Sequence, residues 1–239
     1  SIMMPLVEVA KTEYVDEETI ALTLALLERM GKDPEVVKDT PGFVADRFIS
    51  QAGLEGGYSL GEADIKEIDA AIIYGMGMPF GIFQLLDWIG LDVALDVCNY
   101  LEGALGEEYG APEPLKLMVE QGCLGQKTGD GFYDYSEGIP NVSKEDWKTF
   151  DPLRILAPLV NEAGKLIEDD IADAGKIDRI LKLSIFFSRS FLSRADEVGL
   201  SKIIQKLEEL RGENANSWYE PAKPLREMDR AGKKFADLI

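Results

Sequence analysis

Histidine is absent from all 239 residues of the chain, and cysteine occurs only twice, at Cys98 and Cys123. Without histidine, and with two cysteines that lie far apart, the sequence has no zinc-ligand pattern, so we expect no structural or catalytic zinc site. Two isolated cysteines also form no disulfide framework. This favours a reducing compartment, and we expect a cytoplasmic protein.

Basic residues are scarce as well. Lys and Arg number 25 against 44 Asp and Glu, which gives a formal net charge of −19 at pH 7. Nucleic-acid binding through counterion release requires a basic face, so we expect no nucleic-acid partner. The charge favours solubility but is unfavourable for a domain that meets phosphate groups, which another part of a parent protein would then have to hold.

Long apolar runs and a signal peptide are also missing, and we expect no membrane span. The composition is 46% hydrophobic and 29% charged, enough to bury a core of one or two domains. The opening residues, Ser1-Ile2-Met3-Met4-Pro5, are an unusual native start and indicate a fragment boundary or a remnant of cloning.

Residues 1–40 have the pattern of a strand, a helix and a second strand. Pro5–Lys11 is short, apolar and β-branched, and Glu35–Lys38 is the second candidate strand. Asp16 is placed to cap the intervening helix, which we expect to end at Gly31. A sheet of two short strands is marginal by itself, so this segment is interpreted as the remnant of a larger sheet.

From residue 41 onward the apolar residues recur at helical spacing. We expect helices over about 43–57, 62–75 and 82–103. The last of these has Gly90 in its interior, which is tolerated at some cost and predicts close packing there. Another helical run ends at Gly122, a residue suited to the positive φ of a helix terminus.

After a polar, proline-interrupted segment at 136–151, predicted to be a linker, the chain repeats itself. Seven residues recur after 109 positions: Ala63, Ile68, Asp69, Asp87, Gly90, Leu91 and Pro112 match Ala172, Ile177, Asp178, Asp196, Gly199, Leu200 and Pro221. Four more recur after 110: Pro114, Leu115, Met118 and Gly122 match Pro224, Leu225, Met228 and Gly232. This register predicts a duplicated helical domain, at 41–135 and 152–239, whose copies pack face to face as an internal pseudo-dimer.

The second copy lacks features that mark the first. Lys127 has no counterpart before the chain ends, and three glycines of one corner are replaced: Gly75, Gly77 and Gly81 correspond to Ser184, Phe186 and Ser190. We therefore expect the second copy to be structural and the first to hold any site.

Four motifs, in order, resemble those of the 3-hydroxyacyl-CoA dehydrogenase family. They are Met4–Val9, Asp39–Arg47, Gly75–Asp87 and Gly125–Tyr135, which contains Gly-x-Lys-Thr-Gly-x-Gly-Phe-Tyr. The resemblance implies a mainly α fold: two tandem helical domains like the C-terminal domain of 6-phosphogluconate dehydrogenase, preceded by a strand-helix-strand remnant of a Rossmann domain. No Gly-x-Gly-x-x-Gly motif follows a strand in this chain.

The resemblance also implies roles for single residues. Glu8 matches a glutamate that orients a histidine base lying upstream in the family, a residue this sequence lacks. Met78 and Phe80 match an apolar wall for the acyl chain, and Lys127 matches a lysine near the nicotinamide end of the cofactor. Read from the residues alone, Lys127 would be an ordinary turn lysine. Asp87 recurs in the second copy, which favours a structural role as a cap or in an ion pair.

Asp46 departs from the family pattern, which has asparagine at this position. The asparagine amide donates a hydrogen bond to the substrate, whereas an ionised carboxylate only accepts and repels developing negative charge. Burial could keep Asp46 protonated, or Arg47 or Lys127 could pair with it. On residue type alone, it is a polar residue early in a helix.

The expected function is the C-terminal portion of an NAD-dependent enzyme that oxidises (S)-3-hydroxyacyl-CoA to 3-oxoacyl-CoA in fatty-acid β-oxidation or related acyl-CoA metabolism. The implied partners are an acyl-CoA substrate, the Rossmann domain and an enoyl-CoA hydratase domain of a parent protein. The free edge of the first strand could pair with a second copy of the chain, so a homodimer is also expected. Without histidine, we expect the isolated chain to be inactive.

Two alternatives stay open. The chain could be a non-catalytic acyl-CoA-binding or assembly module, which Asp46 and the missing histidine favour. It could also belong to the wider group of hydroxyacid dehydrogenases, whose helical domains are built on similar lines.

Overall fold

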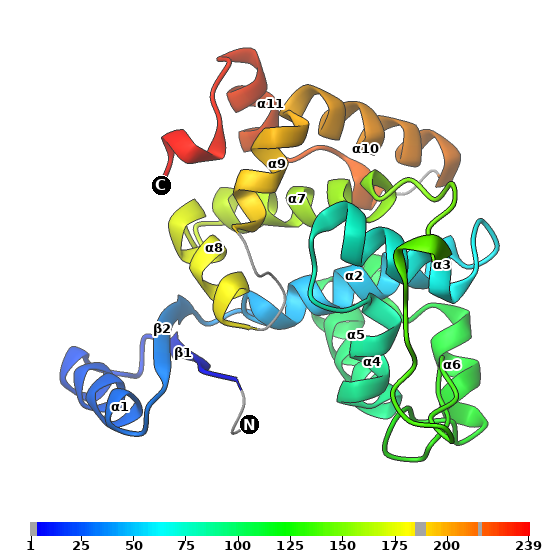
Figure 1. Cartoon of the computed structure of the whole chain (residues 1–239). Helices are drawn as coiled ribbons and strands as arrows, with labels where there is room; N and C mark the ends of the chain where they lie inside the picture. Colours follow the sequence, from blue (N-terminus) through cyan, green and yellow to red (C-terminus); the bar gives the residue numbers. More distant parts are fainter. Residues whose placement is uncertain (1–3, 185–189, 215–216) are drawn as a thin grey trace.

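The computed structural model describes residues 4–184, 190–214 and 217–239. At one side of the molecule lies a small lobe with strand β1 (Leu6–Lys11), helix α1 (Glu17–Arg29) and strand β2 (Asp33–Lys38) (Figure 1). The two strands are parallel, in register from Leu6 opposite Asp33 to Lys11 opposite Lys38. The Asp16 carboxylate accepts a hydrogen bond from the Thr19 amide and caps α1, as predicted.

The rest of the described chain is helical and falls into two consecutive sets, which we call the first and second helical units. The first unit contains α2 (Ala45–Ser59), α3 (Ile65–Ala70), a π-helical turn (Ala71–Met76), α4 (Ile82–Ile89), α5 (Leu91–Leu105) and α6 (Glu113–Glu120). The second contains α7 (Leu153–Glu168), α8 (Ala174–Leu183), α9 (Phe191–Val198), α10 (Leu200–Asn214) and α11 (Lys223–Arg230). Short 3₁₀ turns cover Glu107–Tyr109, Lys144–Asp146, Ser217–Tyr219 and Phe235–Asp237.

One predicted helix is wrong. The expected helix over 82–103 is two helices, α4 and α5, which meet at Gly90. Gly90 has φ +105°, outside the helical region, and its missing side chain leaves room for Lys127: a Cβ at this position would lie 2.9 Å from Lys127 Nζ. The predicted close packing at Gly90 is present, but it accompanies a break in the helix.

The two units meet along α2 and α7, both almost entirely buried and in the middle of the molecule (Figure 1). Two buried ion pairs cross this contact. Arg47 of α2 reaches Glu162 of α7, with Nε and Oε1 2.5 Å apart, and Arg154 of α7 pairs with Glu55 of α2. The charges therefore tie the first turn of each helix to a later turn of the other.

A tyrosine hydroxyl is hydrogen-bonded to one member of each ion pair. Arg47 donates to the Tyr109 hydroxyl at 3.1 Å, and the Tyr219 hydroxyl donates to Glu55 at 3.2 Å. The guanidinium carbon of each arginine lies 5.9 Å from the centroid of its tyrosine ring. Because Arg47 directly follows Asp46, this contact also sets the rotation of α2 at the candidate site.

Corresponding carboxylates make corresponding contacts in the two units. Asp64 accepts from the Glu67 amide and caps α3, and Asp173 accepts from the Lys176 amide and caps α8. Asp69 accepts from the Phe83 amide at the start of α4. Its counterpart Asp178, 109 positions later, accepts from the Leu192 amide of α9. Of the residues matched to the glycine corner, Phe186 lies outside the described residues.

The segment 136–151 is anchored to the first unit. The Pro140 carbonyl accepts from Gln84, and the Val142 carbonyl accepts from the Tyr74 hydroxyl. Glu67 accepts from the amides of Thr149 and Phe150. The predicted connector is therefore held in place along most of its length.

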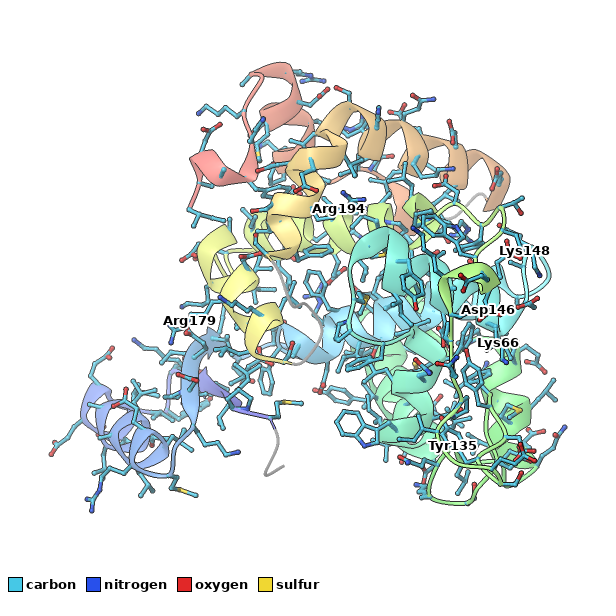
Figure 2. All side chains as sticks on the ribbon, viewed as in Figure 1. Lys66, Tyr135, Asp146, Lys148, Arg179 and Arg194 are labelled. Carbon is cyan, nitrogen blue, oxygen red and sulfur yellow. The ribbon has the colours of Figure 1, made fainter. Side chains whose placement is uncertain are left out.

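The second unit also contacts the small lobe. Arg179 of α8 pairs with Glu35 of β2, and Figure 2 shows Arg179 beside that strand. Lys176 donates to the Val36 carbonyl at 2.8 Å. These contacts lie on β2, and no further strand pairs with β1 among the described residues.

Candidate functional site

Glu8 of β1 holds the start of helix α2. Its Oε1 accepts from the Val44 amide at 2.9 Å and its Oε2 from the Ala45 amide at 3.1 Å. The N-cap residue of α2, Val44, has no side chain that could do this, so a carboxylate from a distant strand satisfies the free amides and favours the positive end of the helix. Glu8 is thereby half-buried and fixed in direction.

The chain enters α2 through a turn with unusual backbone angles. Phe43 has φ +45°, a left-handed conformation that is uncommon for a bulky residue, and Gly42 before it has φ +73°. This turn presents the Val44 and Ala45 amides to Glu8. Strained residues of this kind gather at functional sites, and Phe43 is one that the sequence analysis did not single out.

Asp46 lies in the first turn of α2, beside the Glu8 carboxylate. It lines a pocket of about 380 Å³ between the start of α2 and the exposed face of α5. The lining residues are Asp39, Thr40, Gly42, Phe43, Asp46, Val93, Asp96, Val97 and Tyr100. We call this the acidic pocket, because its three charged lining residues are all aspartates.

Both carboxyl groups at this helix terminus are shifted toward the neutral form. Burial raises the pKa of Glu8, against the lowering effect of the two amides, and the nearby Asp46 raises it further. Asp46 is exposed by surface area, yet the surrounding protein withdraws enough water to raise its pKa as well. Two neighbouring carboxyls are therefore easier to protonate than free aspartate or glutamate.

The side chain of Lys127 reaches the start of α5 from the glycine-rich loop. Its ammonium group pairs with Asp92 in the first turn of that helix, and both side chains are partly exposed. The next residue, Val93, lines the acidic pocket. Lys127 itself is not among the residues that line this pocket.

Asp87 supports the loop that carries Lys127. Its carboxylate accepts from the amides of Phe132 and Tyr133, each at 2.9 Å, and from the Tyr135 hydroxyl at 3.1 Å. The structural role expected of Asp87 is confirmed. Among the described residues it is neither a helix cap nor part of an ion pair, however: it holds the aromatic end of the glycine-rich loop.

A larger, mostly apolar pocket of about 670 Å³ lies beside α4. Its lining residues are Pro79, Phe80, Gln84, Leu85, Trp88, Gln126, Tyr135 and Ile139. Tyr135 is labelled near the bottom of Figure 2. Phe80 and Trp88 form an edge-to-face pair with ring centroids 6.4 Å apart. Gln126, the residue before Lys127, also lines this pocket. We call this the apolar pocket.

Two glycines of the corner before α4, Gly75 and Gly81, lie close to side chains of the same unit or its neighbouring segment. A Cβ on Gly75 would lie 3.0 Å from Trp147 and from Pro152, and one on Gly81 would lie 1.9 Å from the Asp69 carboxyl carbon. Met78 is buried in the core and does not line the apolar pocket, whereas Phe80 does.

The structure thus brings Glu8 and Asp46 together and places Phe80 near Gln126, whereas Lys127 pairs with Asp92 and is not among the residues that line the acidic pocket. Sequence reasoning missed Phe43 and the α5 face formed by Val93, Val97 and Tyr100. The spacing of these three residues along one helix face was a usable signal. Among the described residues, no His, Cys, Asp and Glu group could hold a metal ion, and no helix is long and apolar enough to cross a membrane.

Family models of known proteins match most of the chain. The family model described as 3-hydroxyacyl-CoA dehydrogenase, C-terminal domain, matches residues 42–135 and again residues 152–236. The model described as 3-hydroxyacyl-CoA dehydrogenase, NAD binding domain, matches residues 1–40.

Curated relatives include the fatty acid oxidation complex subunit alpha of Vibrio campbellii, 31% identical, and that of Idiomarina loihiensis, 32% identical. The matches cover 98% and 97% of this chain and 35% of each relative, so the chain spans about a third of the length of these proteins.

Solved structures are similar as well. The 3-hydroxybutyryl-CoA dehydrogenase of Escherichia coli has a TM-score of 0.84 over 96% of this chain and 68% of its own, at 21% identity, which shows the fold. The (S)-3-hydroxybutyryl-CoA dehydrogenase of Ralstonia eutropha is 38% identical over 56% of this chain and 48% of its own, with a TM-score of 0.53.

Proposed function

The chain belongs to the 3-hydroxyacyl-CoA dehydrogenase family, and we propose that it supplies the helical wall of an enzyme that oxidises (S)-3-hydroxyacyl-CoA to 3-oxoacyl-CoA. The observation that carries the proposal is the contact of Glu8 with the start of α2. It fixes a carboxylate, Asp46 and the acidic pocket in one place. Fatty-acid β-oxidation is the proposed setting, in line with the names of the relatives.

In this proposal Glu8 is a positioning residue. The reaction removes a proton from the 3-hydroxyl oxygen and a hydride from the carbon that bears it, and NAD, when bound, would supply the hydride acceptor. A carboxylate held by two amides cannot swing away, so it can steady an imidazole donated from an upstream segment as that base becomes positive. Asp46 would face the substrate oxygen, and only its protonated form could donate a hydrogen bond there.

The residues present fit one end of NAD and not the other. The acidic pocket is lined by Asp39, Asp46 and Asp96 without a lysine or arginine, which suits an uncharged or cationic ring and disfavours phosphate. Lys127 would approach the nicotinamide end from the start of α5. The cofactor phosphates would then rest on the remainder of a Rossmann domain, of which we propose that residues 1–40 are a part.

We propose that Phe80 and Met78 contribute to acyl binding in different ways. Phe80 would form part of the wall of the apolar pocket, while Met78 supports the corner from the core. The pocket size, about 670 Å³, is compatible with an alkyl chain, and its lining is mainly carbon.

The proposed organisation is two tandem helical domains of one type, at 41–135 and 152–239, joined by the anchored segment 136–151. Its support is the recurrence of the Asp64, Asp69 and Asp87 contacts and the match of one family model to both parts. The second domain would replace a partner subunit at the face of α2.

Further partners are proposed on weaker support. These are an acyl-CoA substrate and an enoyl-CoA hydratase domain in a parent protein. A homodimer through the β1 edge is another, which a concentration series of size measurements would test. Two free cysteines support a cytoplasmic location.

The test is a chimera in which residues 4–239 follow only that part of a homologous 3-hydroxyacyl-CoA dehydrogenase that precedes the segment equivalent to residues 1–40, so that the strand-helix-strand segment with Glu8 occurs once. We expect the chimera to form NADH from a 3-hydroxyacyl-CoA and the 239-residue chain alone to form none. Glu8→Gln in the chimera should lower kcat and change its pH profile. A folded chimera without turnover would contradict the proposal, as would turnover by the chain alone.

A second candidate function is a non-catalytic acyl-CoA-binding or assembly module. Asp46, in place of the family amide, favours it. In the chimera, the substitution Asp46→Asn separates the two: if the parent is an enzyme, turnover is present with Asp46 and rises with the amide. If turnover appears only in the Asp46→Asn variant, the module is the better description.

A further inference from the structure

The second helical unit has a pocket unlike any described surface of the first. It has a volume of about 530 Å³ and lies between the end of α7, the 217–219 turn and the whole length of α11. Four cationic side chains line it: Lys165, Lys223, Arg226 and Arg230. We call it the basic pocket. It is well separated in sequence from every residue of the candidate site.

Three acidic residues also line this pocket, and each contacts one of its basic residues, so the cations outnumber the carboxylates by four to three. Glu220 is shared between Arg226, at 2.8 Å, and Arg211, which lies outside the pocket. Glu168 accepts from the Lys223 amide at 3.1 Å and so caps α11. Glu227 is only within 3.8 Å of the Lys223 ammonium.

Two of the cations lack an acidic partner. The Lys165 ammonium donates to the Trp218 carbonyl at 3.1 Å and lies 3.9 Å from the centroid of the Trp218 ring, and no carboxylate of the described chain comes within ion-pair distance of it. Arg230 likewise forms no ion pair with a described residue. Two of the four cations that line this cavity are therefore not neutralised by an ion pair with a described residue.

The first unit does not share this charge pattern. At a separation of 110 residues, Lys223 corresponds to Glu113 and Arg230 to Glu120 of α6. Two cations of the pocket thus stand where the first unit has carboxylates, while the helix itself is kept. The basic pocket is therefore not a by-product of the shared fold.

We propose that the basic pocket binds a phosphate-bearing small molecule, with the phosphate between Lys165, Lys223 and Arg230. Ammonium and guanidinium groups are the natural partners of phosphate, and charge-assisted hydrogen bonds supply both affinity and direction. The volume exceeds that of a free phosphate, so an organic phosphate such as a nucleotide-containing cofactor fits the site. The inference does not depend on the proposed function.

The test is calorimetric titration of the 239-residue chain with CoA, with dephospho-CoA, which lacks the 3′-phosphate, and with inorganic phosphate. The key variant is Lys223→Gln with Arg230→Gln, two exposed residues whose replacement leaves the core intact. Lys202→Gln with Lys233→Gln removes the same charge from exposed positions outside the pocket.

We expect at least one organic phosphate to bind. The key variant should lose about tenfold or more in affinity, the effect of a lost charged hydrogen bond, and the control variant should bind as the parent does. Preference for CoA over dephospho-CoA would identify the 3′-phosphate as the bound group; equal affinity would identify the diphosphate. Added salt should weaken binding.

Three results would overturn the proposal. They are no binding of any of the three ligands, equal losses in the two variants, and undiminished binding by a key variant with native circular dichroism. CoA binding that survives in the key variant would place CoA in the candidate cleft and leave the basic pocket without a ligand.

Discussion

The two helical units share a contact in which an aspartate holds the last segment, but they differ in the loops that follow it. Asp87 in the first unit and Asp196 in the second each accept two backbone amides from the segment that follows the last helix. Beyond that contact the first unit continues into a glycine-rich loop with Lys127, whereas the second ends in a short 3₁₀ turn, Phe235–Asp237. Carboxylates that hold backbone amides are thus common to both units, and the loops that follow distinguish the units.

The buried ion pairs offer the largest expected effect. Replacing Glu55 by Ala leaves Arg154 charged and buried, and we expect the unfolding free energy to fall by about 3–5 kcal/mol. Urea denaturation followed by circular dichroism measures it. The matched variant Glu162→Ala should cost at least as much, because Arg47 then keeps only the neutral Tyr109 hydroxyl, whereas Arg154 keeps a second carboxylate, Glu62, at 3.7 Å. Equal losses would mean that the two pairs are energetically the same.

Gly81 and Ser190 occupy matching positions before α4 and α9. Gly81→Ala would push a methyl group against the Asp69 carboxyl, so we expect a loss of about 3 kcal/mol from overpacking and disturbed hydrogen bonds. Ser190→Ala removes a hydrogen bond to Asp178 and the N-cap on the Ser193 amide, and should cost about 1–2 kcal/mol. Thermal unfolding of both variants ranks them. The reverse order would show that the corner of the first unit can accommodate an added methyl group at Gly81.

The carboxylates that hold the last segment of each unit should also differ. Asp87→Ala leaves two amides and a tyrosine hydroxyl without an acceptor, and should cost about 2–3 kcal/mol. Asp196→Ala frees two amides in a more exposed place and should cost about 1–2 kcal/mol. Hydrogen exchange at residues 125–135 would report local opening in the first variant. Protection there at the parent level would remove the role assigned to Asp87.

Asp69 predicts a pH dependence. Burial raises its pKa from 3.8 to about 7, so the folded chain binds this proton more tightly than the unfolded chain. Its contribution to stability is therefore complete below pH 3.8 and is lost as the pH rises through 7. In Asp69→Asn the unfolding free energy should fall less steeply across this range, by up to about 1.4 kcal/mol per pH unit. An unchanged slope in denaturation curves at several pH values would contradict the shift.

Lys127 should give the smallest effect on stability. Its pair with Asp92 is partly exposed, so Lys127→Ala should change the unfolding free energy by less than about 0.5 kcal/mol. The same substitution in the chimera should still raise the KM for NAD. A stability loss as large as that of Asp87→Ala would make Lys127 a structural residue instead.

Much of the fold could be predicted from residue patterns. The strands, the Asp16 cap, the helical character after residue 40 and the structural role of Asp87 followed from local chemistry and from the repeat. The break at Gly90 could not, because only the approach of Lys127, 37 positions later, reveals that the missing side chain is needed.

The site was less accessible to sequence reasoning. Glu8 could be singled out, but its grip on the Val44 and Ala45 amides depends on how a strand and a helix meet. The ion pairs between α2 and α7 could not be predicted from the sequence for a related reason. Arg47 and Arg154 are 107 residues apart, as are Glu55 and Glu162, so they fall outside the 109-residue register of the later helices.

The most direct test of the account is NADH formation by the chimera, compared across three variants. The account assigns the chemistry to β1 and the first unit and support to the second. Glu8→Gln and Lys127→Ala should therefore lower kcat/KM for a 3-hydroxyacyl-CoA, and Lys202→Ala, on the exposed surface of α10, should leave it unchanged. Full turnover by both first-half variants in a folded chimera would contradict the account.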